Sequence, residues 1–124
     1  MATTPNLMQA IFTAITRDLD QMGWAAGCQP VGHWSVHAGP GYRLLLEGQL
    51  DASYSDTECG QVLAEWAGLL GLRRVETPTC EGTTEYAGQI DNMDVLLWGV
   101  TDQDAFEAEA EQDRRARRDR KGER

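Results

Sequence analysis

The sequence lacks the features that mark secreted and membrane-spanning proteins. Its cysteines, Cys28, Cys59 and Cys80, are far apart and odd in number, which is typical of reduced thiols and not of a disulfide framework. The N-terminal segment carries no early basic residue, and polar residues interrupt its apolar ones, so it fits neither a signal peptide nor a membrane span. We therefore predict a cytoplasmic protein that makes no membrane contact.

Motifs for catalysis, phosphate binding and metal binding are also missing. The glycine-rich stretch 39–41 precedes a predicted strand, whereas a phosphate-binding loop needs a helix start behind it. His33 and His37 fall on a predicted strand, where a spacing of four residues separates them by about 13 Å, too far for one zinc ion. We therefore predict no catalytic residue, no cofactor and no metal site.

Positive charge is scarce over most of the chain. Residues 1–112 contain four basic and seventeen acidic residues, a net charge of −13. Residues 113–124 contain seven basic and three acidic residues, a net charge of +4, so the overall −9 conceals both. An acidic body repels nucleic acid and attracts basic partners.

The residues that are present are those of a folding chain. A length of 124 residues suffices for one hydrophobic core without disulfides or metals. Hydrophobic residues make up 41% of the sequence, and four tryptophans provide large apolar surfaces: Trp24, Trp34, Trp66 and Trp98. We predict a single α+β domain over residues 1–104 and a charged C-terminal helix or tail over residues 105–124.

The first predicted helix covers about residues 5–22. Thr4 can cap it, and apolar residues recur at three- and four-residue spacing from Met8 to Met22. Gly23 is placed to end it, since glycine adopts the left-handed conformation without a steric penalty.

A second helix is predicted over about residues 56–70. Ser55 and Glu58 match the capping box, in which each side chain accepts a hydrogen bond from the backbone amide of the other residue. Gly71 is placed to end this helix. A third helix can begin near Asp102, and acidic residues crowd its first turns while arginines crowd its last.

Five segments alternate between apolar and polar residues with the period of a strand. The first two form a hairpin and the last three a meander, at residues 31–38, 42–50, 72–77, 83–90 and 93–101. The predicted order is α-β-β-α-β-β-β-α. We expect a two-layer sandwich in which an antiparallel sheet of about five strands carries the first two helices on one face.

The last predicted strand is apolar on both faces, so something must cover the face that the helices leave free. The third helix can fold back over that face, or the face can bind a second copy or a protein partner, with Trp98 at its centre. The candidate interface residues are Leu45, Leu96, Trp98, Val100 and Phe106, the last being the one large apolar residue of the third helix.

The basic tail supports a different hypothesis, that the chain binds nucleic acid. Its cations can neutralise phosphates through a salt-dependent and sequence-independent attraction. The residues concerned are Arg114, Arg115, Arg117, Arg118, Arg120 and Lys121. Neighbouring acids weaken this attraction, and a solvated helix is the other interpretation of the tail.

Three functions follow from these patterns. The first is a non-catalytic interaction protein, a small acidic adaptor, inhibitor or regulator, whose partner has a basic surface and which can also form a homodimer. The second is an accessory nucleic-acid-binding protein that uses the tail. The third is a small enzyme with a pocket near Cys28, His33 and His37, which requires these side chains to converge.

Overall fold

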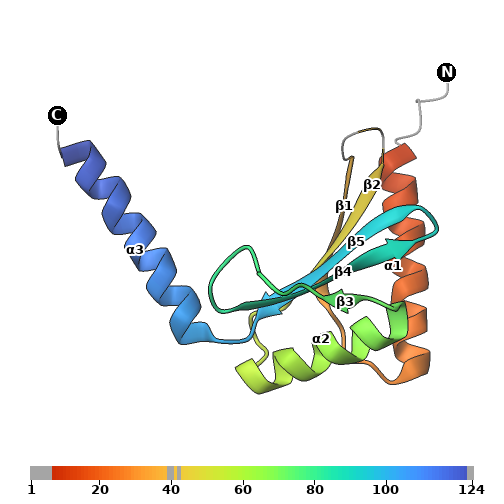
Figure 1. Cartoon of the computed structure of the whole chain (residues 1–124). Coiled ribbons are helices and arrows are strands. Elements are labelled where there is room, and N and C mark those ends of the chain that lie inside the picture. The colour runs from red at the N-terminus through yellow and green to blue at the C-terminus, as the bar shows by residue number, and fades with distance from the viewer. Residues whose placement is uncertain (1–6, 39–40, 42, 123–124) are drawn as a thin grey trace.

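The computed structural model describes residues 7–38, 41 and 43–122. In this part of the chain three helices and five strands follow one another in the predicted order (Figure 1). They are α1 (Leu7–Ala26), β1 (Gly32–Ala38), β2 (Leu44–Leu50), α2 (Asp56–Leu70), β3 (Arg73–Arg74), β4 (Thr83–Ile90), β5 (Met93–Val100) and α3 (Gln103–Gly122). The predicted α+β class and element order are confirmed.

The strand order in the sheet is β1-β2-β5-β4-β3. The hairpin of β1 with β2 and the meander from β3 to β5 are both antiparallel, as predicted. The central strands β2 and β5 are parallel, with Leu46 opposite Val95, so the sheet is mixed and not wholly antiparallel. Parallel neighbours need a long connection, and α2, β3 and β4 provide it between these two strands.

Helix α1 continues four residues beyond its predicted end because Gly23 packs inside the helix layer. A side chain at Gly23 would collide with the indole of Trp66. The left-handed residue is Gly27, with a φ of 77°, and the amide of Cys28 donates to the Gly23 carbonyl at 2.8 Å. The predicted cap Thr4 and most of the predicted turn at 39–41 lie outside the described residues.

Helix α2 begins and ends as its sequence predicts. The Ser55 hydroxyl accepts the Glu58 amide at 3.2 Å, and the Glu58 carboxylate accepts the Ser55 amide at 3.2 Å. Gly71 is left-handed, with a φ of 69°, and the Leu72 amide donates to the Ala67 carbonyl at 2.9 Å. These local contacts fix the residues at which α2 begins and ends.

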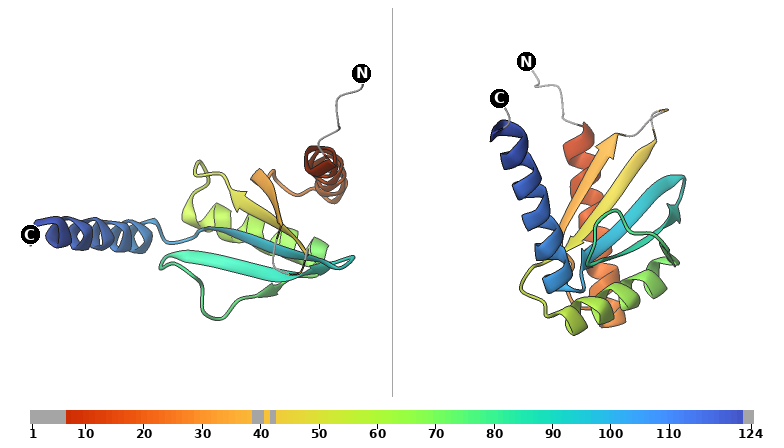
Figure 2. Two further views of the ribbon diagram at one scale, coloured as in Figure 1. Left: turned by 90° about the horizontal axis from the view of Figure 1, so that it is seen from above. Right: turned by 60° about the vertical axis from the view of Figure 1, so that its left-hand side comes forward.

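The core lies between the sheet and the helices α1 and α2, which share one face of the sheet (Figures 1 and 2). The rings of Trp34 on β1 and Trp66 on α2 meet edge to face, with centroids 5.6 Å apart. A Cβ at Gly48 would come within 2.6 Å of Trp34 and 2.9 Å of Leu97, so only glycine fits beneath these rings. The largest fully buried side chains are Trp66, Leu46, Leu63, Leu97, Val31, Val95 and Cys59.

Helix α3 starts against the body and then leaves it (Figures 1 and 2). The Asp102 carboxylate accepts the Ala105 amide at 3.1 Å, so Asp102 caps the helix. The carboxylate of Asp56 on α2 accepts the Gln103 amide at 3.3 Å. From Gln112 to Lys121 every side chain is exposed. No helix in the described part of the chain is both long and apolar enough to cross a membrane.

Candidate interaction surface

The face of the sheet turned away from α1 and α2, called the open face below, collects four of the five predicted interface residues. Because side chains alternate along β5, Leu96, Trp98 and Val100 all point away from the core residues Val95 and Leu97. The parallel register pairs Leu45 with Asp94 and so places Leu45 on the same face. All four side chains are half-buried.

Helix α3 does not fold back over the open face, so that interpretation is wrong. The helix continues beyond the end of β5 and runs away from the sheet (Figure 2). It has no apolar stripe with which to pack, since charged residues occupy all its sides after Phe106. Phe106 instead lines a hollow of about 170 Å³ at the edge of the open face, together with Trp98 and Val100.

The segment 75–82 between β3 and β4 covers part of the open face. In Figure 2 it lies on the side of the sheet opposite α2. Glu85 holds it there: the Glu85 carbonyl accepts the Val75 amide at 2.9 Å, and its carboxylate accepts the Thr79 amide at 3.2 Å. A second hollow of about 200 Å³ remains between this segment and the sheet, lined mainly by apolar atoms and including Leu96 and Trp98.

Trp98 therefore stands between two hollows. Its neighbours across the sheet are Gln49 on β2 and Glu85 on β4. The indole Nε1–H donates to the Glu47 carboxylate at 3.3 Å, which fixes the ring while leaving it half-buried. The arrangement offers an aromatic ring with a carboxylate on each side, an environment that suits an apolar side chain or a cation.

The remaining charges of the open face are partly paired. Arg43 contacts Asp94 at 3.0 Å, and the Nε2 of His37 lies 4.0 Å from Glu47. Glu85, whose exposed fraction is 8%, makes no ion pair within the described part of the chain. The side chain of Glu47 is 29% exposed, so of the two carboxylates beside Trp98 this is the one that can attract a cation from a partner.

Ser35, His37 and Glu47 form a polar cluster that the sequence reading missed, although the alternation along β1 places Ser35 and His37 on one face. The Ser35 hydroxyl lies 3.0 Å from the Nε2 of His37. Glu47 approaches that same nitrogen at 4.0 Å. A catalytic triad needs the acid on one ring nitrogen and the nucleophile on the other. The cluster therefore does not have triad geometry.

The predicted Cys28, His33 and His37 pocket does not form. Cys28 lies on the helix side of the sheet, in a hollow shared with Trp24 and Trp66. His33 and His37 alternate with the core residues Trp34 and Val36 and therefore face the opposite side. The structure thus brings no histidine to Cys28 within the described residues.

The thiol environments oppose ionisation. Burial raises the pKa of Cys28, and Glu65 raises it further. Burial raises the pKa of Cys59 to about 11, with Asp56 adding to the effect. A position in the first turn of a helix favours the thiolate, but the effect of burial is larger at Cys59.

We expect thiol labelling to follow exposure. Cys80 is exposed, Cys28 half-buried and Cys59 buried. At mildly alkaline pH a maleimide should react first with Cys80, more slowly with Cys28, and with Cys59 only after unfolding. Peptide mass mapping of timed samples would check this order of labelling, and rapid labelling of Cys59 in the folded chain would contradict it.

Folding raises the pKa of Cys59, which also makes stability depend on pH. The contribution of Cys59 to stability is complete below pH 9 and falls as the pH rises toward 11.

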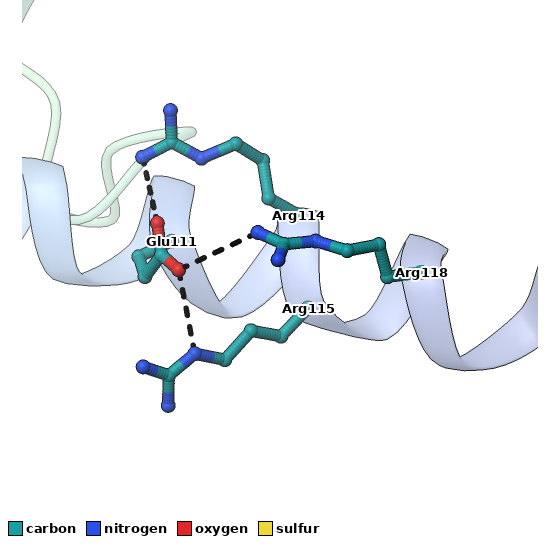
Figure 3. A network of polar contacts seen from close by, with 4 residues as sticks. All are labelled: Glu111, Arg114, Arg115 and Arg118. Carbon is teal, nitrogen blue, oxygen red and sulfur yellow. Dashed lines mark hydrogen bonds and ion pairs between the residues drawn. The ribbon is translucent and has the colours of Figure 1, made fainter.

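The six predicted tail cations all lie on α3, but they do not form a free cluster. Glu111 contacts Arg114 at 3.0 Å, Arg115 at 3.3 Å and Arg118 at 3.9 Å (Figure 3). Arg120 donates to the carbonyl of Ala116 at 3.4 Å. The remaining two, Arg117 and Lys121, make no ion pair within the described part of the chain.

Comparison with known proteins adds no assignment. A scan against protein-family models and searches of the curated proteins and of the solved structures found no match. Within the described residues no three histidine, cysteine or acidic side chains gather where they could hold a metal ion. The open face and α3 are therefore the features from which a function can be proposed.

Proposed function

We propose that the chain is a non-catalytic interaction module that binds a protein partner through the open face. One observation carries the proposal: Trp98 lies half-buried between two hollows, on a sheet face that α3 leaves uncovered. Tryptophan is enriched among the residues that contribute most to binding energy, and such residues fill or flank pockets near the interface centre. Contiguous apolar surface rimmed by polar residues also marks interaction sites.

The two hollows and their charges describe the partner. Volumes of about 170 and 200 Å³ each suit one or two apolar side chains. The Glu47 carboxylate, which accepts the indole N–H, favours a lysine or arginine beside those side chains. The charge of −13 over residues 1–112 adds a longer-range attraction for a basic partner. A small acidic adaptor, inhibitor or regulator fits this description.

Replacing Trp98 by alanine should weaken partner binding about 10- to 100-fold while leaving the fold intact, because the side chain is only half-buried. Quantitative capture from native-host lysate would identify proteins retained by the unchanged chain and lost by Trp98→Ala. Met22→Ala is the control, since Met22 is an exposed large apolar side chain that lies outside the open face and lines neither of its hollows. Isothermal calorimetry with the purified partner would then give the change in affinity.

Equal capture by Trp98→Ala and the unchanged chain would overturn the proposal. Nuclease treatment of parallel samples tests the nucleic-acid alternative, because capture through the α3 cations would disappear with the nucleic acid. The shared carboxylate of Glu111 weighs against that alternative, since it offsets part of the charge of three arginines.

A further inference from the structure

A second surface lies at the end of α1, on the helix side of the sheet. Trp24 has an exposed fraction of 88%, twice that of Met22 at 44%, the next most exposed large apolar side chain among those whose burial the structure describes. It borders a hollow of about 530 Å³, which Cys28 and Trp66 also line and whose surface is mainly apolar. An exposed tryptophan beside a cavity of this size commonly indicates a binding site.

Acidic residues surround this hollow. Asp20 lies one helical turn before Trp24 and lines the same hollow. Two further hollows adjoin it. One shares Gln29 with it and is also lined by Glu58 and Glu65, and the other shares Cys28 and is also lined by Glu65. No described residue that lines these three hollows is basic, and Glu65 raises the pKa of the Cys28 thiol. The acidic groove is defined here as Asp20, Trp24, Cys28, Glu58 and Glu65.

The same chain carries the complementary charge on α3. Arg114, Arg117 and Lys121 follow one another at three- and four-residue spacing and so lie along one side of the helix, named the basic stripe here. All three are exposed, and two of them make no ion pair within the described residues. In Figures 1 and 2 α3 leaves the body on the side away from the end of α1, so it is the groove of another copy that this stripe can reach.

We propose that the basic stripe of one copy binds the acidic groove of a second copy, with an arginine of the stripe stacked on Trp24 beside Asp20. Exposed ion pairs alone contribute little, so the aromatic contact and the hollow are needed for a specific contact. Guanidinium groups stack on indole rings, and a carboxylate next to the ring favours the cation further. Two such contacts close a symmetric pair in which each α3 occupies the other copy's groove.

This inference concerns the helix side and is independent of the open face. Sedimentation equilibrium of the full chain should show a monomer–dimer equilibrium that weakens as salt rises, because the charges involved are exposed. Trp24→Ala should raise the dimer dissociation constant about tenfold. Met22→Ala, on the same helix but outside the groove, should leave it unchanged.

A charge exchange provides the sharper test. The groove variant combines Asp20→Lys with Glu65→Lys, and the stripe variant combines Arg117→Glu with Lys121→Glu. Each alone should be monomeric, because groove and stripe then carry the same sign, whereas an equimolar mixture should form a one-to-one pair with both contacts restored. Native mass spectrometry would read out the pair, and circular dichroism would verify that the helices persist.

Three results would overturn the inference, and the first two concern the charge dependence. One is a chain that stays monomeric at low salt over the whole concentration range. The other is a dimer that neither the groove variant nor the stripe variant affects. A dimer lost on Trp98→Ala and kept on Trp24→Ala would also contradict it, since the contact would then lie on the open face.

Discussion

Replacing Trp66 by alanine lowers the free energy of unfolding by about 3–5 kcal/mol, the range expected for removing a buried aromatic side chain. Trp66 has an exposed fraction of 2% and contacts the ring of Trp34. Its Nε1–H donates to the Gln29 carbonyl at 2.7 Å, so the substitution also leaves that carbonyl without its partner. Gly23 packs directly on the same ring, so α1 would lose this contact. Urea denaturation followed by circular dichroism would give the change.

Trp24→Ala is the matched control for this prediction, because the same atoms are removed from the surface. The exposed fraction of Trp24 is 88%, so the free energy of unfolding should change by less than about 0.5 kcal/mol. The protein should be dilute enough in both experiments to keep self-association from adding to the measured stability. Similar losses for the two variants would mean that Trp66 is not the centre of the core.

The two tryptophans show where sequence reasoning stops. Trp66 recurs with Val62 and Leu63 at helical spacing, which predicts its burial, whereas Trp24 follows the predicted end of the first helix and belongs to no such pattern. The environment of Trp24 depends on where α1 ends: Gly23 stays helical, and the chain turns at Gly27. The choice between two nearby glycines depends on the packing of Gly23 against Trp66, a contact between residues 43 positions apart. Local propensity cannot supply that information.

Elements whose signals are local were predicted well, except that β3 has only the two residues Arg73–Arg74 of the strand predicted over residues 72–77. The capping box at Ser55 and the left-handed Gly71 fix α2 through contacts within the helix itself. The hairpin and the meander follow from alternation and from turns between neighbouring strands. The parallel pairing of β2 with β5 has no local signal, because the two strands meet only after α2, β3 and β4 have been placed.

For the open face, too, some features were predictable from the sequence and others were not. Alternation along β5 was enough to place Leu96, Trp98 and Val100 on one face. The neighbours of Trp98 could not be predicted, since Glu47 reaches it across the parallel pairing and Glu85 across β4. The two hollows depend on the segment 75–82 and on the direction of α3, neither of which has a periodic pattern.

The direction of α3 depends on Gly82, and replacing this residue by alanine should lower the free energy of unfolding by about 2–4 kcal/mol. Gly82 has a φ of 78°, and a Cβ there would lie 2.6 Å from the Phe106 nitrogen, in the first turn of α3. Its carbonyl accepts the amides of Thr101 at 2.9 Å and Asp102 at 3.0 Å. The clash is with backbone, which cannot rotate away as a side chain can. Thermal and urea unfolding would measure the loss.

The stability loss expected for Gly82→Ala has two causes, the strained backbone conformation and the clash of the added Cβ, and Gly27→Ala separates them. Gly27 has nearly the same φ, 77°, but no atom lies within 4 Å of where its Cβ would be, so this variant carries the conformational strain alone, about 1–2 kcal/mol. A larger loss for Gly82→Ala, with faster amide exchange at the start of α3, would show that close packing against Gly82 holds the helix away from the open face. Equal losses would mean that this contact is loose. The helix could then swing, and the access of a partner to Trp98 would depend on the position of α3.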